Sequence, residues 1–514
     1  MSTDVMSTGV VVVGGGPVGL MLAAELSLAG IRPVVLERLR EPGDVPKANG
    51  LVGQIVQVLD YRGLLERFSA GAQFAGPAPY FQFGALPLDL RRLGTSPLHL
   101  LPIPQPRLER LLSERARELD VDLRPGHELT ALRQDDDGVT ADVRGPQGDY
   151  RLRTRYLVGC DGAHSLVRRL AGIGFPGTTG REVARFGDVT LPASVIVPGT
   201  GDLDLPWAGR VAPGFTRTET GVFAFSSFRP GVHRVAALEW GEPAADRGGP
   251  ISLEELQAAV RRVLGADLPV ERPHWLSRVR ANSRQAERYR AGRILLAGDA
   301  AHAISAFGGP ALNVGLQDAV NLSWKLAAQV GGCAPPGILD TYHAERHPVA
   351  ARVLMHTQAQ SALMAPGPEI SALRELFGDL LGTDGVLRGI AELLHGSDVR
   401  YDMDGARPHP LTGGLAPDLP LVTDGGTTRV ARLLHAARPV VLDLAGRSCV
   451  REAALPWTDR VDIVSAHPGE GRPADSLLIR PDAYVAWAAP PGEADDQVRD
   501  GLRRALTRWF GAGR

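Results

Sequence analysis

Cysteine is scarce in this sequence: only three occur in 514 residues, Cys160, Cys333 and Cys449, and they lie far apart. A sparse, odd number of cysteines argues against a disulfide framework. No CxxC pair is present that could form a dithiol redox centre. The histidines are scattered without metal-ligand spacing, so we expect no metal site.

Long apolar runs are also missing. No segment reaches the roughly 18 apolar residues of a membrane-spanning helix, and the N-terminus lacks the basic and apolar regions of a signal peptide. The formal net charge is −2, which gives no electrostatic reason to bind nucleic acid or an anionic membrane. We therefore expect a cytoplasmic protein with neither a nucleic-acid nor a membrane partner.

Glycine and proline, by contrast, are frequent, and their positions divide the chain into regions that differ in their pattern of strands, helices and turns. A chain of this length is too long for one core, so two or three domains are expected. Residues 1–180 begin with a strand–helix–strand unit, continue through an irregular stretch and a helix, and end in short strands, whereas residues 181–275 hold short strands between Pro/Gly turns and predict an inserted mixed β-sheet. Residues 276–397 return to the first pattern and end in helices. Residues 398–514 predict a separate C-terminal α/β domain.

The first motif, Gly14-x-Gly16-x-x-Gly19, follows an apolar strand and opens a helix, and Glu37 ends the next strand. Gly14 permits a tight turn, Gly16 lets a pyrophosphate approach the backbone, and Gly19 lets helix and strand pack closely. The helix N-terminus presents N–H groups and a partial positive charge to phosphates. Glu37 can accept hydrogen bonds from both ribose hydroxyls. This βαβ unit predicts a dinucleotide-binding site.

Two further turns follow strand ends. Residues 158–168 read Val-Gly-Cys-Asp-Gly-Ala-His-Ser-Leu-Val-Arg, and residues 293–302 read Arg-Ile-Leu-Leu-Ala-Gly-Asp-Ala-Ala-His. In the second turn, a strand delivers Asp299 beside a glycine, where its carboxylate can accept hydrogen bonds from a sugar-alcohol chain. His302, which follows, is interpreted as a cap or packing residue. Taken singly, each motif is typical of an ordinary turn.

Together and in this order, the three motifs resemble the group A flavoprotein monooxygenases, the family of para-hydroxybenzoate hydroxylase and phenol hydroxylase. The resemblance implies an α/β fold with a Rossmann-like FAD-binding domain formed by residues 1–180 and 276–397. A substrate-binding sheet, residues 181–275, is inserted between these two parts. It further implies FAD as the cofactor, O2 as the oxidant and NAD(P)H as a transient co-substrate, because the chain has no second dinucleotide fingerprint.

The resemblance also implies which residues hold FAD. These residues are Gly14, Gly16, Pro17, Val18, Gly19, Glu37, Arg38, Gln105, Leu129, Asp161, Asp299, Pro310, Leu312 and Asn313. Glu37 and Arg38 are expected at the adenosine end, with Leu129 near the adenine. Leu312 and Asn313 are expected to place N–H groups of a helix N-terminus at the flavin, where the helix dipole stabilises an anionic reduced ring.

Two departures from the family pattern concern the flavin. Where the family usually has two arginines around a Gly-Leu pair, this chain has Lys47 and Gln54. The flavin loop contains Pro310 and Ala311 where the family usually has Gln and Gly. Pro310 has no N–H to donate, and Ala311 has less conformational freedom than glycine. We expect FAD to bind and the departures to alter flavin motion.

The C-terminal region narrows the resemblance. Residues 478–487 read Leu-Ile-Arg-Pro-Asp-Ala-Tyr-Val-Ala-Trp and resemble the end of the thioredoxin-like domain of phenol hydroxylase and aromatic polyketide hydroxylases. Without CxxC, this domain is expected to be structural or dimer-forming rather than redox-active, in a monomer or homodimer. Within the family, the chain most resembles polyketide-tailoring hydroxylases and rifampicin-type monooxygenases.

The function that the resemblance implies is hydroxylation of an aromatic polyketide or related polycyclic phenol through a flavin C4a-hydroperoxide. Three alternatives stay open: Baeyer–Villiger insertion into a polycyclic ketone, inactivation of an antibiotic, and a non-catalytic flavin- or drug-binding protein. The inserted sheet is expected to cover the substrate. The aromatic residues that could form its wall, or simply its core, are Trp207, Phe223, Phe225 and Trp240.

Overall fold

The computed structural model describes residues 6–43, 48–72, 74–229, 231–241, 251–305, 309–403, 409–469 and 471–514. Lys47 and residues 306–308 of the predicted flavin loop therefore lie outside the described residues.

A parallel sheet forms the centre of the N-terminal domain. Its strands run in the order β19-β20-β11-β1-β2-β8. Their bounds are β1 Met6–Val13, β2 Val34–Glu37, β8 Asp122–Pro125, β11 Gly148–Gly159, β19 Arg290–Ala291 and β20 Ile294–Leu296. All neighbours are parallel except β19 and β20. This confirms the predicted Rossmann-like α/β architecture.

Strand β11 corrects one detail of the sequence interpretation. The sequence pattern predicts two strands here, residues 150–152 as the last strand of a small meander and residues 156–158 as a separate buried strand. They form one strand of twelve residues. Its first part pairs antiparallel with β10 (Val139–Gly145), which pairs with β9 (Glu128–Gln134), and its second part pairs with β1. No turn residue separates the two parts, so the strand continues.

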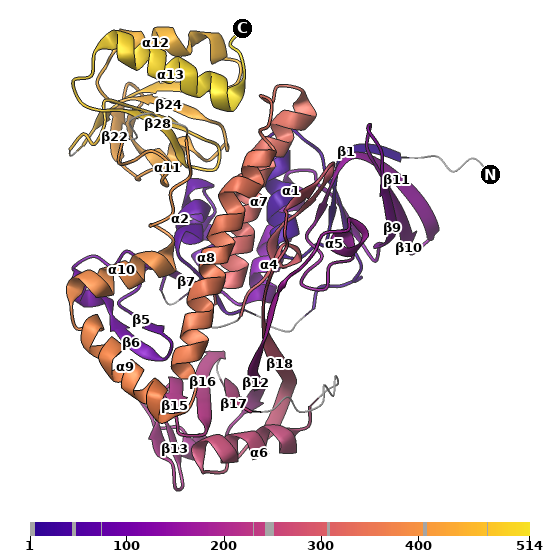
Figure 1. The fold of residues 1–514 in the computed structure, drawn as a ribbon, viewed down its shortest axis with the longest axis vertical. Helices are drawn as coiled ribbons and strands as arrows, with labels where there is room; N and C mark the ends of the chain where they lie inside the picture. Colours follow the sequence, from indigo (N-terminus) through magenta and orange to yellow (C-terminus); the bar gives the residue numbers. More distant parts are fainter. Residues whose placement is uncertain are drawn as a thin grey trace.

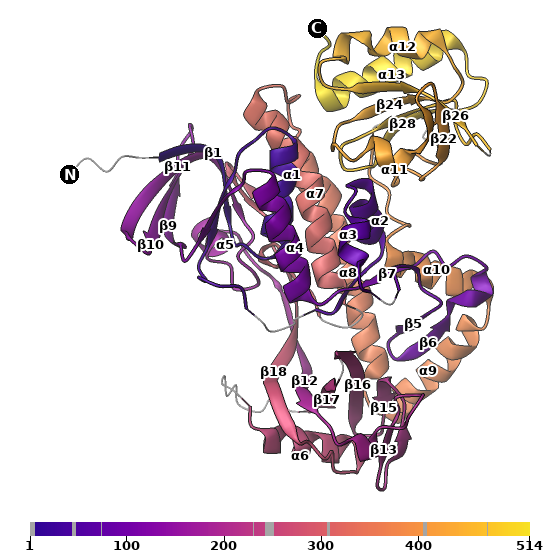
Figure 2. The same ribbon diagram turned by 180° about the vertical axis from the view of Figure 1, so that it is seen from behind.

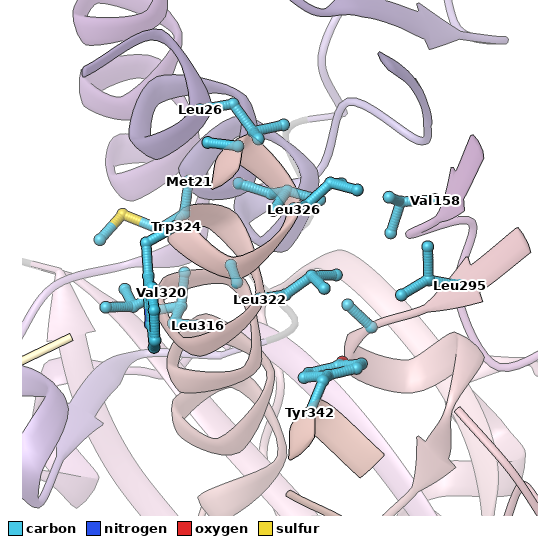
Figure 3. Packing of buried hydrophobic residues seen from close by; sticks show 14 of the residues in the cluster. Met21, Leu26, Val158, Leu295, Leu316, Val320, Leu322, Trp324, Leu326 and Tyr342 are labelled. Atoms are coloured by element: carbon cyan, nitrogen blue, oxygen red, sulfur yellow. The ribbon is translucent and has the colours of Figure 1, made fainter. Parts of the chain in front are cut away.

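Three helices cover one side of this sheet: α1 (Pro17–Leu28), α4 (Gln105–Glu118) and α7 (Pro310–Gly331). Helix α1 is buried along most of its length, from Gly19 to Leu26, because it lies between the sheet and the other two helices. Figure 3 shows side chains of α1 and α7 gathered in one core with residues of β11 and β20.

The inserted domain is a second sheet, with order β15-β16-β17-β12-β18-β21. Its strands are β12 Gly177–Thr190, β15 Gly214–Arg217, β16 Gly221–Arg229, β17 Val232–Trp240, β18 Arg272–Gln285 and β21 His302–Ala303. Each strand pair is antiparallel, so the prediction of a mixed sheet was wrong. Hairpins and long returning strands connect it, without a helical crossover between parallel neighbours.

The two faces of this sheet have different neighbours. Helix α6 (Leu253–Leu264) covers one face, where Phe223 and Phe225 are fully buried among Val and Leu side chains. Because side chains alternate along a strand, Val222 and Ala224 lie on the opposite face. That face packs against Met364 at the end of a long helix, α8 (Asp340–Met364).

Three helices connect the domains. In Figure 1, helix α8 runs from beside α7 to the inserted sheet, where it contacts β18, and it is followed by α9 (Pro368–Leu381) and α10 (Asp384–His395). Short strands β3 (Gly50–Val52), β4 (Gly76–Pro77) and β7 (His99–Pro102) form a small sheet beside α2 (Gln54–Tyr61). Helix α3 (Leu65–Ser69) and the hairpin of β5 (Tyr80–Phe83) and β6 (Leu86–Asp89) complete this region.

The C-terminal domain is thioredoxin-like, with a sheet ordered β25-β24-β27-β28. The strands are β24 Val440–Asp443, β25 Asp462–Ser465, β27 Ser476–Ile479 and β28 Val485–Ala489, with helices α12 Ser448–Ala454 and α13 Asp495–Phe510 on one side. Beside them lie β22 Pro420–Thr423, β23 Gly426–Arg429, α11 Val430–Leu433 and β26 His467–Pro468. Across the described ranges, no helix combines the length and apolarity needed to cross a bilayer.

The burial of Phe223 generates a stability prediction. Phe223→Ala should lower the free energy of unfolding by about 3–5 kcal/mol, because it opens a cavity in a closed core. Trp207→Ala removes another large aromatic ring, but Trp207 is 97% exposed on the turn between β13 (Leu203–Leu205) and β14 (Gly209–Val211). It should change stability by less than about 0.5 kcal/mol. Equilibrium urea unfolding measures both, and equal effects would contradict this assignment.

Candidate active site

The three sequence motifs meet at one edge of the central sheet. Val13 is paired with Leu36 on one side and Gly159 on the other, and Gly159 is paired with Leu296. The turns that follow these strands therefore leave the sheet in one row, at its carboxyl edge. In open α/β sheets, ligands bind in the crevice at this edge.

The first turn is built by contacts that only glycine allows. Gly14 has φ +109°, and a Cβ there would lie 2.3 Å from the carbonyl oxygen of Cys160. A Cβ on Gly19 would lie 1.9 Å from the carbonyl oxygen of Gly14. At Gly16, in contrast, no described atom lies within 4 Å of a Cβ. The turn is thus closed on the protein side and open at Gly16.

Helix α1 begins at this open point. Its N-cap residue is Gly16, Pro17 is its first residue, and no side chain in the described part of the chain caps it. Pro17 lacks the N–H that a first helical residue would leave unpaired. The remaining N–H groups and the helix dipole face outward. This arrangement fits a pyrophosphate, as the resemblance implies for FAD.

Glu37 holds the turn and remains able to bind a ligand. Its carboxylate accepts hydrogen bonds from the N–H of Gly15 (2.7 Å) and of Leu39 (2.8 Å). Each oxygen keeps a second acceptor site for a ribose hydroxyl. Arg38 beside it is exposed. Leu129 is buried, so its side chain belongs to the core, and its main chain lies on the edge strand β9.

Asp161 begins the second turn, which leads into α5 (Leu166–Leu170). It accepts hydrogen bonds from the hydroxyl of Ser165 (2.5 Å) and from the N–H groups of Leu166 (2.7 Å) and Val167 (3.1 Å). Its carboxylate therefore caps that helix directly behind the Gly14 turn.

Arg168 has a role that the sequence interpretation did not assign. Its guanidinium donates to the carbonyl oxygens of Ala163 and Ala300, each at 2.9 Å, and lies 3.6 Å above the ring of Phe175. The second motif is thereby tied to the third. The only sequence signal was its position at the end of the second motif.

Asp299 lies exposed in the third turn, which a buried carboxylate supports. Asp318 accepts hydrogen bonds from the N–H of Gly298 (3.2 Å), His302 Nε2 (2.7 Å) and Arg346 Nε (2.7 Å). Burial by itself would raise the pKa of Asp318, but His302 and Arg346 outweigh it and hold this pKa below its ordinary value. His302 is fully buried, which fits its interpretation as a packing and capping residue.

The first turn of α7 accommodates the departures predicted to disturb it. Gly309 is the N-cap residue with φ +68°, and Pro310 is the first helical residue. Proline suits this position, because no intrahelical N–H bond is lost there. Ala311 is helical, so no glycine conformation is required. Leu312 and Asn313 lie in the first turn as expected.

Asn313 connects this turn to the β3 strand. Its side chain donates to the carbonyl oxygen of Gly309 (2.8 Å) and accepts from the N–H of Val52 (3.0 Å). Gln105, the first residue of α4, is bound to the segment just before β3, because its N–H donates to the carbonyl oxygen of Ala48 (2.9 Å). Its side chain donates to Glu109 (2.7 Å).

Gln54 lies elsewhere. It is buried, and its side-chain oxygen accepts a hydrogen bond from the Tyr484 hydroxyl (3.1 Å), so it faces the C-terminal domain. Gln54, which stands where the family usually has an arginine, is therefore a residue of the interface between two domains.

A small cavity of about 50 Å³ lies beside the first turn of α7. Asn313, Val353, His356 and His395 are among its lining residues, which come mainly from α7, α8 and the end of α10. Burial lowers the pKa of His356 to about 4, and burial followed by the charge of His99 lowers that of His395 to about 3. Both histidines are therefore neutral at physiological pH. Within the described residues, no cluster of three metal-ligating side chains occurs.

The predicted substrate residues separate in the structure. Phe223 and Phe225 point into the core beneath α6, and Trp207 lies on an exposed turn, so the geometry does not support a substrate-wall role for these three. Alternation alone does not say which face of a strand is covered by a helix. Trp240 belongs to the opposite face, and it packs there against the Met364 cluster.

Comparisons with known proteins agree with this geometry. A family model described as the FAD binding domain matches residues 7–357, and one described as aromatic-ring hydroxylase, C-terminal, matches residues 409–513. A 12-dehydrotetracycline 5-monooxygenase/anhydrotetracycline 6-monooxygenase from Streptomyces rimosus is 45% identical over 512 residues, covering 98% of both chains. A rifampicin monooxygenase from Streptomyces venezuelae is 41% identical, also over 98% of both.

A solved structure extends the likeness to the fold. The anhydrotetracycline hydroxylase from Streptomyces rimosus superposes with a TM-score of 0.87 at 43% identity, over 99% of this chain and 100% of the other. The family matches and the full-length similarity cover both the cofactor cradle and the C-terminal domain. The chain therefore belongs to the FAD-dependent aromatic-ring hydroxylases and is a monooxygenase of that family.

Proposed function

We propose that this enzyme hydroxylates an aromatic polyketide or a closely related polycyclic phenol, with NAD(P)H and O2 as co-substrates. The observation that carries the proposal is the full-length similarity to a monooxygenase named for tetracycline intermediates. FAD, when bound, supplies the acceptor for the NAD(P)H hydride and the activation of O2 for transfer of one oxygen atom.

The residues of the chain supply position and charge. The Gly16 opening and the N-terminus of α1 receive the pyrophosphate, and Glu37 receives the ribose. The exposed carboxylate of Asp299 faces the same edge of the sheet, where it can accept hydrogen bonds from the ribityl hydroxyls. The N-terminal dipole of α7, at Leu312 and Asn313, stabilises negative charge on the reduced ring.

The inserted sheet supports a broad, flat substrate. On the face opposite α6 lie three alanines, Ala184, Ala224 and Ala236, in adjacent strands β12, β16 and β17. This face turns toward α8, because the hydroxyl of Ser361 donates to Glu182 on it (2.8 Å). The small side chains make this face flat and apolar, and Phe186 and Trp240 supply aromatic surface beside them.

A second candidate function is the inactivation of an antibiotic. The observation that favours it is the 41% identity to a rifampicin monooxygenase over the whole chain. It uses the same cofactor site and differs in the substrate, which would be a finished antibiotic instead of a biosynthetic intermediate.

The first test is turnover. Purified FAD-loaded enzyme is expected to oxidise NAD(P)H faster when a tetracyclic or angular polyketide phenol is added, and the product should carry one atom from 18O2. Stimulation by ansamycin antibiotics alone would favour the second function. An opened ring or a lactone in the product would show Baeyer–Villiger insertion, and no oxygen incorporation with either class would contradict both functions.

The alanine face gives a specificity test. Ala224→Phe is expected to raise KM for the polycyclic substrate by about tenfold or more, because overpacking of this kind costs about 1–3 kcal/mol. FAD affinity should stay unchanged. Val222→Ala, on the same strand face but fully buried, is the control for stability effects. A KM unchanged by Ala224→Phe would show that the substrate does not contact this face.

The open point of the first turn gives a cofactor test. Gly16→Ala adds a methyl group where no described protein atom lies within 4 Å, so the unliganded protein should keep its stability. We expect the dissociation constant for FAD to rise by about tenfold or more, because the methyl group occupies the pyrophosphate position. Titration followed by flavin fluorescence measures it. Unchanged FAD affinity would place the pyrophosphate elsewhere.

A further inference from the structure

Three consecutive residues of the C-terminal domain, Arg480, Pro481 and Asp482, contact the FAD-binding domain at three different helices. They directly follow β27 in the chain, and the C-terminal domain lies beside α2 in both ribbon views (Figure 1, Figure 2). The side chains of Arg480 and Asp482 are 0% and 2% exposed. The function proposed above makes no use of these charges.

Arg480 binds α8. Its guanidinium donates to both carboxylate oxygens of Glu345, at 2.7 and 2.8 Å, and also pairs with Asp482. It lies 4.5 Å from the ring of Trp509 and 5.2 Å from that of Trp324, so aromatic faces complete its surroundings. Such a bidentate, fully enclosed pair fixes both partners in orientation.

Pro481 reaches α1 through an arginine. Its carbonyl oxygen accepts from Arg62 Nη2 (2.6 Å), and Arg62 Nε donates to Glu25 of α1 (2.8 Å). The remaining nitrogen of Arg62 donates to the carbonyl oxygen of Leu434, also in the C-terminal domain (3.1 Å). The Arg62 and Glu25 side chains are 1% and 3% exposed. Helix α1 is thus held by the C-terminal domain.

Asp482 reaches α7. It accepts a hydrogen bond from the amide of Asn321 (3.1 Å), which in turn accepts one from Lys325 (2.9 Å). Lys325 also binds Glu345 (2.7 Å). The enclosed group contains two cations, Arg480 and Lys325, and two anions, Glu345 and Asp482. Because its charges balance, removing one partner leaves an uncompensated buried charge.

The next residue of α8, Arg346, extends these contacts to the turns that form the FAD site. Arg346, adjacent to Glu345, pairs with Asp318 and donates to the carbonyl oxygen of Val314 in the second turn of α7 (3.1 Å). Asp318 in turn supports the N–H of Gly298 beside Asp299. Glu345 and Arg346 therefore join the C-terminal domain to two of the turns that form the FAD site.

We propose that the Arg480–Asp482 segment is a positioning element of the FAD site, which sets the relative placement of the N-termini of α1 and α7. Both helices pack in one core (Figure 3), and both begin at the cofactor edge. Glu25 lies about 12 Å along α1 from Pro17, and Asn321 about 16 Å along α7 from Pro310. Over such distances a helix moves as one body, so a shift at the clamped end displaces the N–H groups that face FAD.

The test compares two buried aspartates of the C-terminal domain. Asp482→Asn keeps the shape of the side chain but removes the charge that faces Arg480. Asp475→Asn is the matched control, since Asp475 is also buried but binds Arg447 (3.4 Å) and the N–H of Gly492 (3.0 Å), both in the C-terminal domain. The readouts are the FAD dissociation constant, the visible circular dichroism of bound flavin and the midpoint of thermal unfolding. None requires a substrate.

Asp482→Asn is expected to raise the FAD dissociation constant by about tenfold and to change the flavin dichroism, whereas Asp475→Asn leaves both at wild-type values. The proposal is overturned if Asp482→Asn lowers only the thermal midpoint, as a merely structural residue would. Asn321→Ala removes the α7 contact without changing any charge and gives a second measurement if Asp482→Asn does not fold. Wild-type FAD affinity in a folded Asn321→Ala protein would equally overturn the proposal.

Discussion

The cofactor site depends on a single register in the central sheet. Four parallel strands end in one hydrogen-bonded row, at Val13, Leu36, Gly159 and Leu296. Because parallel strands place their carboxyl ends at the same edge, the three glycine-containing turns and Glu37 meet there although they are spread from Gly14 to Asp299 in the sequence. Even a one-residue shift of β11 would separate Cys160 from Gly14, whose contact leaves no space for a side chain.

Buried charge holds what the register brings together. Asp318 and Arg346 are completely enclosed, as are Arg480 and Lys325. Moving such groups out of water is costly unless each is paired, so the network tolerates few arrangements. This rigidity suits an enzyme whose cofactor must be held at helix N-termini, where displacement of an N–H group weakens its effect. The same network gives the C-terminal domain, which has no CxxC pair, a way to influence the geometry of the FAD site.

The inserted sheet shows how strand alternation assigns different roles to neighbouring residues. Phe223 and Phe225 stabilise the domain against α6, while Ala224 between them faces α8. From the sequence, the aromatic residues were candidates for the substrate wall, because large apolar side chains are typical of ligand walls as well as of cores. In this sheet the face that turns toward α8 carries the small side chains.

The sequence by itself determined the family, the cofactor and the main turns, because glycine positions with steric demands and strand-ending acids have few alternative explanations. It also predicted the three regions of the chain and the absence of a dithiol in the last. Only the tertiary structure decided which face of the inserted sheet turns toward α8, and that Gln54 contacts Tyr484. It likewise showed that Pro310 begins a helix without strain. The orientation of the sheet and the Gln54 contact depend on residues tens to hundreds of positions apart, which local patterns of polarity and turn residues do not encode.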